Sequence, residues 1–200
     1  MNKIKIGIDL DEVLAEFNLL FLDYFNQTKN TNWKFKDITD NHFENIFDIS
    51  FEEIKQILNN FSKEGHISNI IPVENSVSSI EKLSKECELF IITARPKEED
   101  KETREWIVKN FKSNFKEIYS VGISHGGKVF KNKGEFVQEL GLNFFIEDMI
   151  KHAIDISKRN IKVFLLDKPW NQEENLPENI YRVKDWNEIL QKIEYLKSVI

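Results

Sequence analysis

In the stretch "IGIDLDEVLAEF", residues 6–17, a short apolar run is followed by two carboxylates, those of Asp9 and Asp11. Residues 3–8 have the length and isoleucine content of a buried strand. Two carboxylates spaced two residues apart repel each other and resist burial, so a structural role alone explains them poorly. The end of this strand is therefore the first place where the sequence predicts a functional site.

Further apolar runs alternate with segments of helical periodicity along the chain. We expect strands at 89–93, 118–121, 144–146 and 162–166, and an edge strand at 180–183. Apolar residues have helical spacing at 75–85, 98–110, 133–140, 150–158 and 186–197. Strands separated by helices form βαβ units and a parallel sheet covered on both faces. The sequence thus predicts an α/β fold, a Rossmann-like three-layer sandwich with a mainly parallel sheet.

One segment, from residue 15 to residue 71, interrupts the alternation. It has helical patterns at 17–25 and 51–61 but no β-rich run. Two βα crossovers are the alternative interpretation. We expect a small helical cap subdomain at 15–71, inserted after the first strand, and a Rossmann-like catalytic core formed by 1–14 and 72–200.

Composition and charge exclude several classes of function. A formal net charge of −6 argues against the basic surface that binds nucleic-acid polymers. No apolar run reaches the roughly eighteen residues of a membrane span, and acidic residues come too early for a signal peptide. Cys87 is the single cysteine, which fits a reducing compartment. We expect a cytoplasmic protein that binds neither membranes nor nucleic-acid polymers; the sequence leaves a homodimer open.

Chemically useful side chains follow several of the predicted strands, at the edge where parallel α/β sheets bind ligands. These side chains are Asp9, Asp11, Thr93, Lys133, Glu147 and Asp148. Several also have a purely structural interpretation. Asp11 and Asp148 could cap the helices that follow them. Thr93 suits the end of a strand, and Lys133 could be a solvated lysine in the first turn of a helix. Their convergence on one edge favours a functional site.

This set of groups suits phosphoryl transfer. A carboxylate can attack phosphorus and form an aspartyl phosphate. Repulsion between the two anions costs about 4 kcal/mol at about 4 Å and an effective dielectric near 20, and a divalent cation removes it. Magnesium prefers oxygen ligands, which Asp9, Asp148 and the main-chain carbonyl of Asp11 can supply. A lysine and a hydroxyl can hold the transferring oxygens, while the second aspartate protonates the leaving alcohol.

Four stretches, "IGIDLDEVLAEF", "LFIITARP", "NKGEFVQELG" and "NFFIEDM", resemble in order the four motifs of the haloacid dehalogenase-like hydrolases. "DLDEVLAEF" with "FFIED" resembles more closely the group of 5′-nucleotidases that includes the deoxyribonucleotidases and bacterial nucleotidases. The resemblance implies an Mg²⁺ cofactor and roles for individual residues. Asp9 would be the nucleophile and Asp11 the acid/base, with a main-chain carbonyl on the metal. Thr93 would be the threonine that closes the second motif, and Lys133 would be the lysine of the third motif. Asp148 would be a metal ligand.

Some assignments remain open. Lys128 and Lys131 lie near Lys133 and are alternatives to it; Lys133 is favoured because it stands before Gly141 in a Lys-x6-Leu-Gly arrangement that resembles the family's. Many members of the family carry two aspartates where this chain has Glu147 and Asp148, and we expect Glu147 to contribute to substrate binding. Arg95 is a second candidate for binding substrate oxygens; the alternative is a surface ion pair with Glu98 or Glu99.

The first functional hypothesis is a magnesium-dependent phosphomonoester hydrolase, a 5′-nucleotidase acting on (deoxy)nucleoside monophosphates. Its partner is then a small phosphorylated metabolite. A phosphatase for another small ester, such as a sugar phosphate, and an inactive binding protein on the same fold are the alternatives. Trp33, Phe35 or Phe43 could stack on a nucleobase or form the core of the cap. Trp170 or Asn171 could border the pocket.

Overall fold

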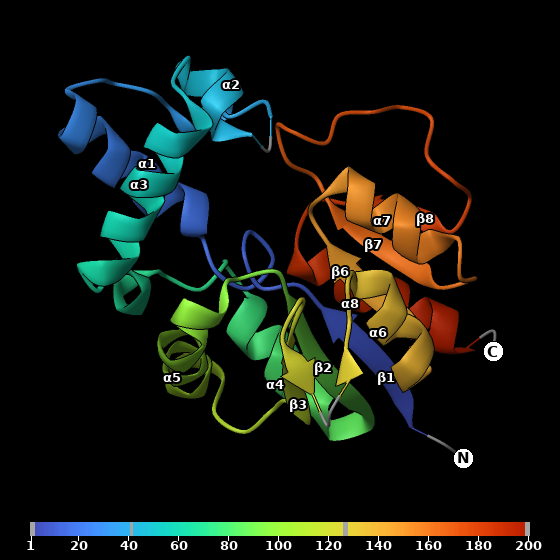
Figure 1. Cartoon of the computed structure of the whole chain (residues 1–200). Coiled ribbons are helices and arrows are strands. Elements are labelled where there is room, and N and C mark those ends of the chain that lie inside the picture. The colour runs from blue at the N-terminus through green and yellow to red at the C-terminus, as the bar shows by residue number, and fades with distance from the viewer. Residues whose placement is uncertain (1–2, 41, 126–127, 199–200) are drawn as a thin grey trace.

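A computed structural model describes residues 3–40, 42–125 and 128–198, so the outer limits predicted for the core, 1 and 200, lie outside the described residues. Six strands form one sheet in the order β3-β2-β1-β6-β7-β8 (Figure 1). All pairings between neighbours are parallel. The strands are β1 Ile4–Ile8, β2 Cys87–Thr93, β3 Glu117–Ser120, β6 Phe144–Glu147, β7 Lys162–Leu166 and β8 Ile180–Val183. The predicted parallel sheet, with 180–183 at its edge, is confirmed.

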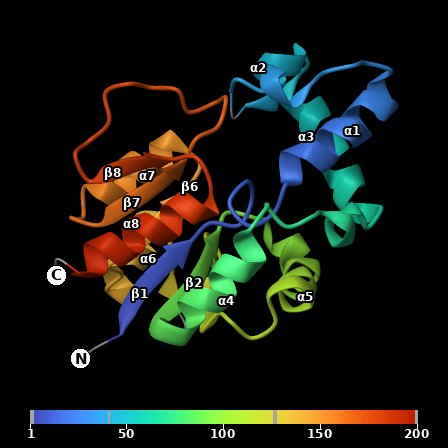
Figure 2. The same ribbon diagram turned by 180° about the vertical axis from the view of Figure 1, so that it is seen from behind.

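Helices cover both faces of this sheet because alternate strand residues bury opposite sides. On β6, Phe144 and Ile146 join one apolar cluster and Phe145 joins the other. The first cluster packs under α4 Ser76–Glu86, α5 Asp100–Phe111 and α8 Trp186–Ser198. The second packs under α6 Lys133–Leu140 and α7 Ile150–Ser157. Figure 2, seen from behind, has α4 and α8 in front of the sheet. The three-layer Rossmann-like architecture is thus confirmed.

The centre of the sheet depends on Gly7. A Cβ on Gly7 would lie 2.5 Å from Cδ2 of Phe145 and 2.6 Å from Cδ1 of Leu142. Gly7 and Phe145 are direct partners in the pairing of β1 with β6. The missing side chain lets the Phe145 ring lie against β1, which explains a glycine inside a buried strand.

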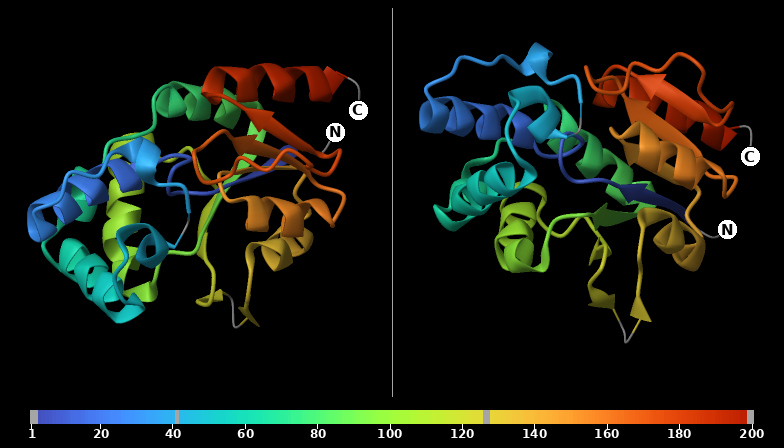
Figure 3. Two further views of the ribbon diagram at one scale, coloured as in Figure 1. Left: turned by 90° about the horizontal axis from the view of Figure 1, so that it is seen from above. Right: turned by 45° about the horizontal axis from the view of Figure 1, so that its top comes forward.

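The segment between β1 and β2 forms a helical layer beside the carboxyl edge of the sheet, separate from the helices that cover its faces (Figures 1 and 3). Aromatic rings fill it, among them Phe25 and Phe47, whose centroids lie 3.9 Å apart. Its described residues contain α1 Phe17–Lys29, η1 Phe35–Asp37, α2 Phe43–Phe47, α3 Phe51–Lys63 and η2 His66–Asn69, and none of them belongs to a named strand. The alternative of two βα crossovers is wrong.

The chain enters and leaves this helical layer at two adjacent places. Glu16 N donates to Ile71 O at 3.0 Å, and Val73 N donates to Leu14 O at 2.9 Å. These bonds tie the two crossing segments side by side, while one apolar cluster continues from the sheet into the helical layer. We propose that a cap (15–71) and a core (1–14 and 72–200) meet at this paired connection.

Local details differ from the expected element bounds. The helix expected from residue 98 begins as a 3-10 turn, η3 Lys97–Glu99, before α5 starts. Two strands of two residues each, β4 Ser124–His125 and β5 Lys128–Val129, form a small antiparallel pair that was not predicted. None of the helices in the described residues combines the length and apolarity that crossing a bilayer requires.

Candidate active site

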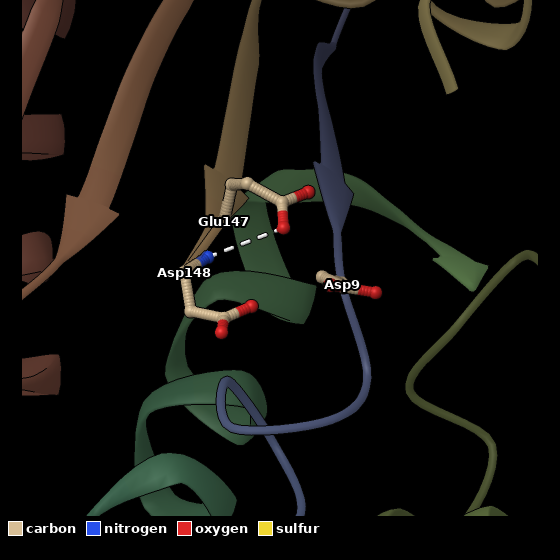
Figure 4. A group of neighbouring side chains, drawn as sticks. All are labelled: Asp9, Glu147 and Asp148. Atoms are coloured by element: carbon tan, nitrogen blue, oxygen red, sulfur yellow. Dashed lines mark hydrogen bonds between the residues drawn. The ribbon is translucent and has the colours of Figure 1, made fainter. Parts of the chain in front are cut away.

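The carboxyl ends of β1 and β6 bring three acidic side chains together. Asp9 N donates to Ile146 O at 3.0 Å, which continues the pairing of the two strands by one residue. Asp9 therefore lies next to Glu147 and Asp148 (Figure 4). One oxygen from each carboxylate lies within 4.8 Å of the other two, and all three side chains are buried.

Lys133 connects two of these carboxylates. Its Nζ lies 2.6 Å from Asp9 Oδ2 and 2.8 Å from Glu147 Oε2. The Asn132 side chain accepts from Glu135 N at 3.0 Å and caps α6, so the helix begins at Lys133. Burial lowers the pKa of Lys133, but Asp9 and Glu147 outweigh burial and raise it above its ordinary value, which keeps the ammonium charged.

The alternative of a solvated Lys133 is wrong, because that side chain is buried. Lys131 is exposed to solvent, so its position differs from that of Lys133. The side chain of Lys128 lies outside the described part of the chain. Lys133 is therefore the lysine that the described residues place against the acidic cluster.

Glu147 uses both of its oxygens inside the protein. Oε1 accepts from Asp148 N at 3.3 Å and Met149 N at 3.1 Å, and Oε2 accepts from Lys133. Burial raises the pKa of Glu147, but Lys133 and His152 outweigh burial and lower it below its ordinary value. Glu147 is absent from the lining of the cavity described below. Its contacts thus hold Lys133 and the end of β6, and the structure adds nothing in favour of the expected substrate contact.

Asp148 is held by the loop that follows β7. Trp170 Nε1 donates to Asp148 Oδ2 at 2.9 Å, and Asn171 Nδ2 donates to Asp148 O at 2.6 Å. Met149, and not Asp148, precedes the first residue of α7, so the capping interpretation of Asp148 is wrong. Trp170 also lines the cavity, as the sequence suggested, whereas Asn171 lies buried behind it.

The balance of charge in this cluster fits a divalent cation. Three buried carboxylates share one ammonium group, that of Lys133, among the described residues. Burial, and then the charge of Glu147, raises the pKa of both Asp9 and Asp148 well above the ordinary value. Such an excess of buried negative charge, on oxygen donors alone, suits Mg²⁺. Asp9 and Asp148 are the ligands that this arrangement favours.

Asp11 faces a different partner, Arg95. Arg95 donates to both Asp11 oxygens, from Nε at 3.0 Å and from Nη2 at 2.5 Å. Nη1 donates to Thr103 Oγ1 at 3.1 Å, and the backbone N of Arg95 donates to Thr93 Oγ1 at 3.2 Å. The Arg95 side chain is buried, so the interpretation as a surface ion pair is wrong. Asp11 does not cap α1, which starts at Phe17.

Glu12 has a left-handed backbone conformation, with φ of 60°. Its carboxylate accepts from Asn18 N at 2.6 Å and lies 3.4 Å from Lys168 Nζ. Burial raises the pKa of Glu12 to about 7, and Lys168 opposes this shift. A left-handed turn favours glycine, and the hydrogen bond and the ion pair of the Glu12 side chain offset part of the backbone cost of a glutamate here.

A cavity of about 1030 Å³ lies between the cluster and the helical layer. The carboxyl edge of the sheet contributes charged and polar groups, namely Asp9, Asp11, Thr93, Arg95, Lys133 and Asp148. The opposite wall mixes apolar residues with polar and charged ones. The apolar residues include Phe17, Phe43, Phe51, Ile54 and Leu58, and the polar ones include His42, Lys55 and Asn59. The cavity therefore offers charged groups on the wall formed by the sheet edge, and both aromatic rings and polar groups on the wall formed by the helical layer.

The three rings considered for base stacking lie in different places. Phe43 lines the cavity. Trp33 packs on Phe47 with ring centroids 5.5 Å apart, and Phe35 meets Trp170 edge-to-face at 5.7 Å. Of the three, Phe43 is the one placed to contact a ligand.

Known proteins resemble this chain over almost its whole length. The family model described as "5′ nucleotidase, deoxy (Pyrimidine), cytosolic type C protein" matches residues 2–199. A nucleotidase of Clostridium acetobutylicum is 25% identical over 196 residues, which cover 98% of this chain and 96% of that protein.

Solved structures agree on the fold. A haloacid dehalogenase-like hydrolase from Streptococcus pneumoniae superposes with a TM-score of 0.68 at 16% identity, covering 96% of this chain and 98% of its own. A hydrolase of the same superfamily from Geobacter sulfurreducens superposes with a TM-score of 0.63 at 13% identity, covering 96% of both chains. With the acidic cluster at the carboxyl edge, the matches lead to one assignment. The chain is a phosphatase-type enzyme of the haloacid dehalogenase-like fold and belongs to the family of cytosolic type C 5′ (pyrimidine) deoxynucleotidases.

Proposed function

We propose that this protein is a magnesium-dependent 5′-nucleotidase that hydrolyses (deoxy)nucleoside monophosphates through an aspartyl-phosphate intermediate. The observation that carries the proposal is the position of Asp9. Its carboxylate lines the cavity, with Oδ2 bound by Lys133 and Oδ1 accepting from Leu10 N at 2.8 Å. A carboxylate held at both oxygens and open to a cavity is a pre-oriented nucleophile.

The side chains of Asp9 and Asp148 and the main-chain carbonyl of Asp11 would hold the Mg²⁺. When bound, the ion polarises phosphoryl oxygens and offsets the repulsion between a carboxylate and a phosphate. Lys133 and the Thr93 hydroxyl, both on the cavity wall, can donate to those oxygens, and Arg95 on the same wall is a further donor.

The reaction has two steps. An Asp9 oxygen attacks phosphorus, the bond from phosphorus to the ester oxygen breaks, and the leaving alcohol takes a proton from Asp11. Water then gives a proton to Asp11 and attacks the aspartyl phosphate, which releases inorganic phosphate and restores Asp9. Asp11 suits both transfers because its side chain is about a third exposed (32%) and lines the same cavity.

Two observations support a nucleotide as the substrate, the lining of the cavity and the family to which the chain belongs. The wall opposite Asp9 offers the Phe43 ring to a nucleobase, and the volume of about 1030 Å³ exceeds what a sugar phosphate alone would fill. The nucleotidase description of the family points to the same class of substrate. The family description and the single cysteine also support a cytoplasmic location.

The test is Asp9→Asn, assayed with Mg²⁺ on p-nitrophenyl phosphate and on a panel of nucleoside monophosphates and sugar phosphates. We expect the variant to lose roughly 10⁴-fold or more of kcat while it stays folded, because an amide cannot form the acyl phosphate. Asp155→Asn, the same change of charge on α7 away from the cavity lining, is the control. Retained turnover in Asp9→Asn would remove Asp9 as the nucleophile, and a preference for sugar phosphates would remove the nucleotide substrate.

A further inference from the structure

The loop after β7 grips Asp148 at two points, through its side chain and through its backbone. Trp170 binds the carboxylate, and Asn171 binds the main-chain oxygen. Asn171 Nδ2 also donates to Leu166 O at 2.7 Å, while its Oδ1 accepts from Arg182 Nη1 at 2.6 Å. Both residues are buried, Asn171 completely. This loop therefore fixes both the backbone and the carboxylate of Asp148.

The same indole contacts the cap. Phe35, in η1, meets the Trp170 ring edge-to-face, with centroids 5.7 Å apart and planes at 65°. Lys168 Nζ lies 5.8 Å from the centroids of both rings. Figures 1 and 2 show the loop after β7 reaching from the sheet toward the helical layer. We refer to Phe35, Lys168 and Trp170 as the aromatic clasp.

The clasp is also tied to the loop that follows β1. Lys168 Nζ lies 3.4 Å from Glu12 Oε2, and only 15% of the Lys168 side chain is exposed. The lysine is thus held between a carboxylate of the core and two rings, one from the core and one from the cap. Such a contact forms completely only with the cap in the position that the structure has.

The bond from Trp170 to Asp148 differs from the other tryptophan bonds of the described residues. Trp106 Nε1 donates to Ile70 O, and Trp186 Nε1 donates to Val13 O, so both indoles end on backbone oxygens. Trp170 ends on a carboxylate of the acidic cluster. Hydrogen bonds of this kind orient metal-binding carboxylates, and their loss typically costs about 10- to 100-fold in metal affinity.

We propose that Trp170 is a positioning residue that orients Asp148 for Mg²⁺ and couples this orientation to docking of Phe35 on the cap. The inference rests on the proposed role of Asp148 as a metal ligand. Because such coupling is reciprocal, bound Mg²⁺ in turn favours the docked cap. The closed position of the cap and a competent metal site thus form together.

Trp170→Phe tests the first half of the proposal, since it keeps a ring for Phe35 but removes the N–H group. Mg²⁺ binding to the full chain is measured by titration calorimetry without substrate. We expect the Kd to rise about tenfold or more. Trp106→Phe, which loses an indole bond to the backbone oxygen of Ile70, outside the acidic cluster and the cavity lining, should leave the Kd within about twofold. Equal Kd values for Trp170→Phe and the parent chain would overturn the proposal.

Phe35→Leu tests the coupling. We expect the Kd for Mg²⁺ to rise roughly threefold in the parent chain but not further in Trp170→Phe, because the indole transmits the effect. Additive effects of the two changes would overturn the coupling. If Trp170→Phe does not fold, the rise in Kd in Phe35→Leu is the deciding measurement, since among the described contacts Trp170 is the residue that meets both Phe35 and Asp148. Failure of the parent chain to bind Mg²⁺ would overturn the proposed metal site together with this inference, whereas binding that ignores both substitutions overturns the inference alone.

Discussion

At the scale of single residues, Asp9 and Asp11 differ in burial and in charged partner, although they are only two residues apart. Residues two apart on a strand share a face, but β1 ends at Ile8 and the chain turns after it. Asp9 is buried against Lys133, and Asp11 is partly exposed against Arg95. One carboxylate is thus fixed beside the other acids, while the other lines the cavity with a different partner and greater exposure, so the two can take different roles in the proposed reaction.

Asp11→Asn should separate substrates by their leaving groups. We expect kcat for nucleoside monophosphates to fall about 10²- to 10⁴-fold, since their alcohols need a proton to leave. The loss for p-nitrophenyl phosphate should be much smaller, because p-nitrophenolate leaves without one. Steady-state kinetics on both substrates is the measurement. The same loss on both would contradict the role of Asp11 as the acid.

Gly7→Ala should destabilise the sheet without any change of charge. The new Cβ would meet the Phe145 ring and Leu142 at about 2.5–2.6 Å, and overpacking of this kind costs about 1–3 kcal/mol. Urea unfolding would measure the loss. Glu88→Ala, on a half-buried position of β2, should stay within about 0.5 kcal/mol of the parent chain. Unchanged stability in Gly7→Ala would mean that Phe145 moves aside.

At the scale of elements, two helices begin with the same kind of N-cap, but the residues that follow the two caps have different contacts. Ser50 caps α3 by accepting from Glu53 N at 3.2 Å, and Asn132 caps α6 by accepting from Glu135 N at 3.0 Å. The first residue of α6 is Lys133, whose ammonium binds Asp9. The start of α6 therefore positions the ammonium group that binds Asp9, whereas the start of α3 positions Phe51 on the cavity wall.

Ser50→Ala and Asn132→Ala form a matched pair. Each should lower the free energy of unfolding by about 1 kcal/mol through loss of the cap. Asn132→Ala should also lower kcat by about tenfold, because Lys133 is then no longer fixed at the start of a capped helix. Ser50→Ala should leave kcat unchanged and act on KM, because Phe51, the first residue of α3, lines the cavity. Thermal denaturation and steady-state kinetics measure the two effects. Equal kcat values in the two variants would show that Lys133 is positioned without its helix cap.

The elements that could be predicted are those whose pattern is local. The six strands of the sheet follow from short apolar runs, and the choice of Lys133, which begins α6, follows from an arrangement before Gly141 that resembles the family's. The pair β4 and β5 has two residues in each strand, too few for any periodicity. Elements whose apolar pattern extends over several residues could thus be predicted from the sequence, and elements of two residues could not.

The contacts that could not be predicted join distant parts of the chain. Arg95 binds Asp11 across 84 positions, and Trp170 binds Asp148 across 22. Nothing in the local sequence distinguishes a buried arginine from one on the surface, because the choice depends on which side chains the fold brings near it. For Trp170 the only signal was a polar loop after a strand, which placed it near the pocket but named no partner.

At the scale of the whole molecule, the acidic cluster links folding to the proposed ion. Asp9, Glu147 and Asp148 lie together in the folded chain but not in the unfolded one, so a cation that binds them stabilises the fold. Mg²⁺ at about one hundred times its Kd should add about 2.7 kcal/mol, which raises Tm by roughly 5–10 °C.

Asp148→Asn should abolish most of this rise in Tm, and KCl at matched ionic strength should not reproduce it. Differential scanning fluorimetry with and without EDTA is the measurement. An equal rise in the parent chain and in Asp148→Asn would place the ion elsewhere on the protein.

The side-by-side crossings at Glu16–Ile71 and Leu14–Val73 also bear on how such a protein changes over evolutionary time. A block of residues whose two ends touch can grow, shrink or be exchanged without pulling the strands on either side of it out of register. Chemistry and selectivity then become separable traits: new preferences can be acquired by remodelling the inserted block while the acids at the sheet edge stay where they are.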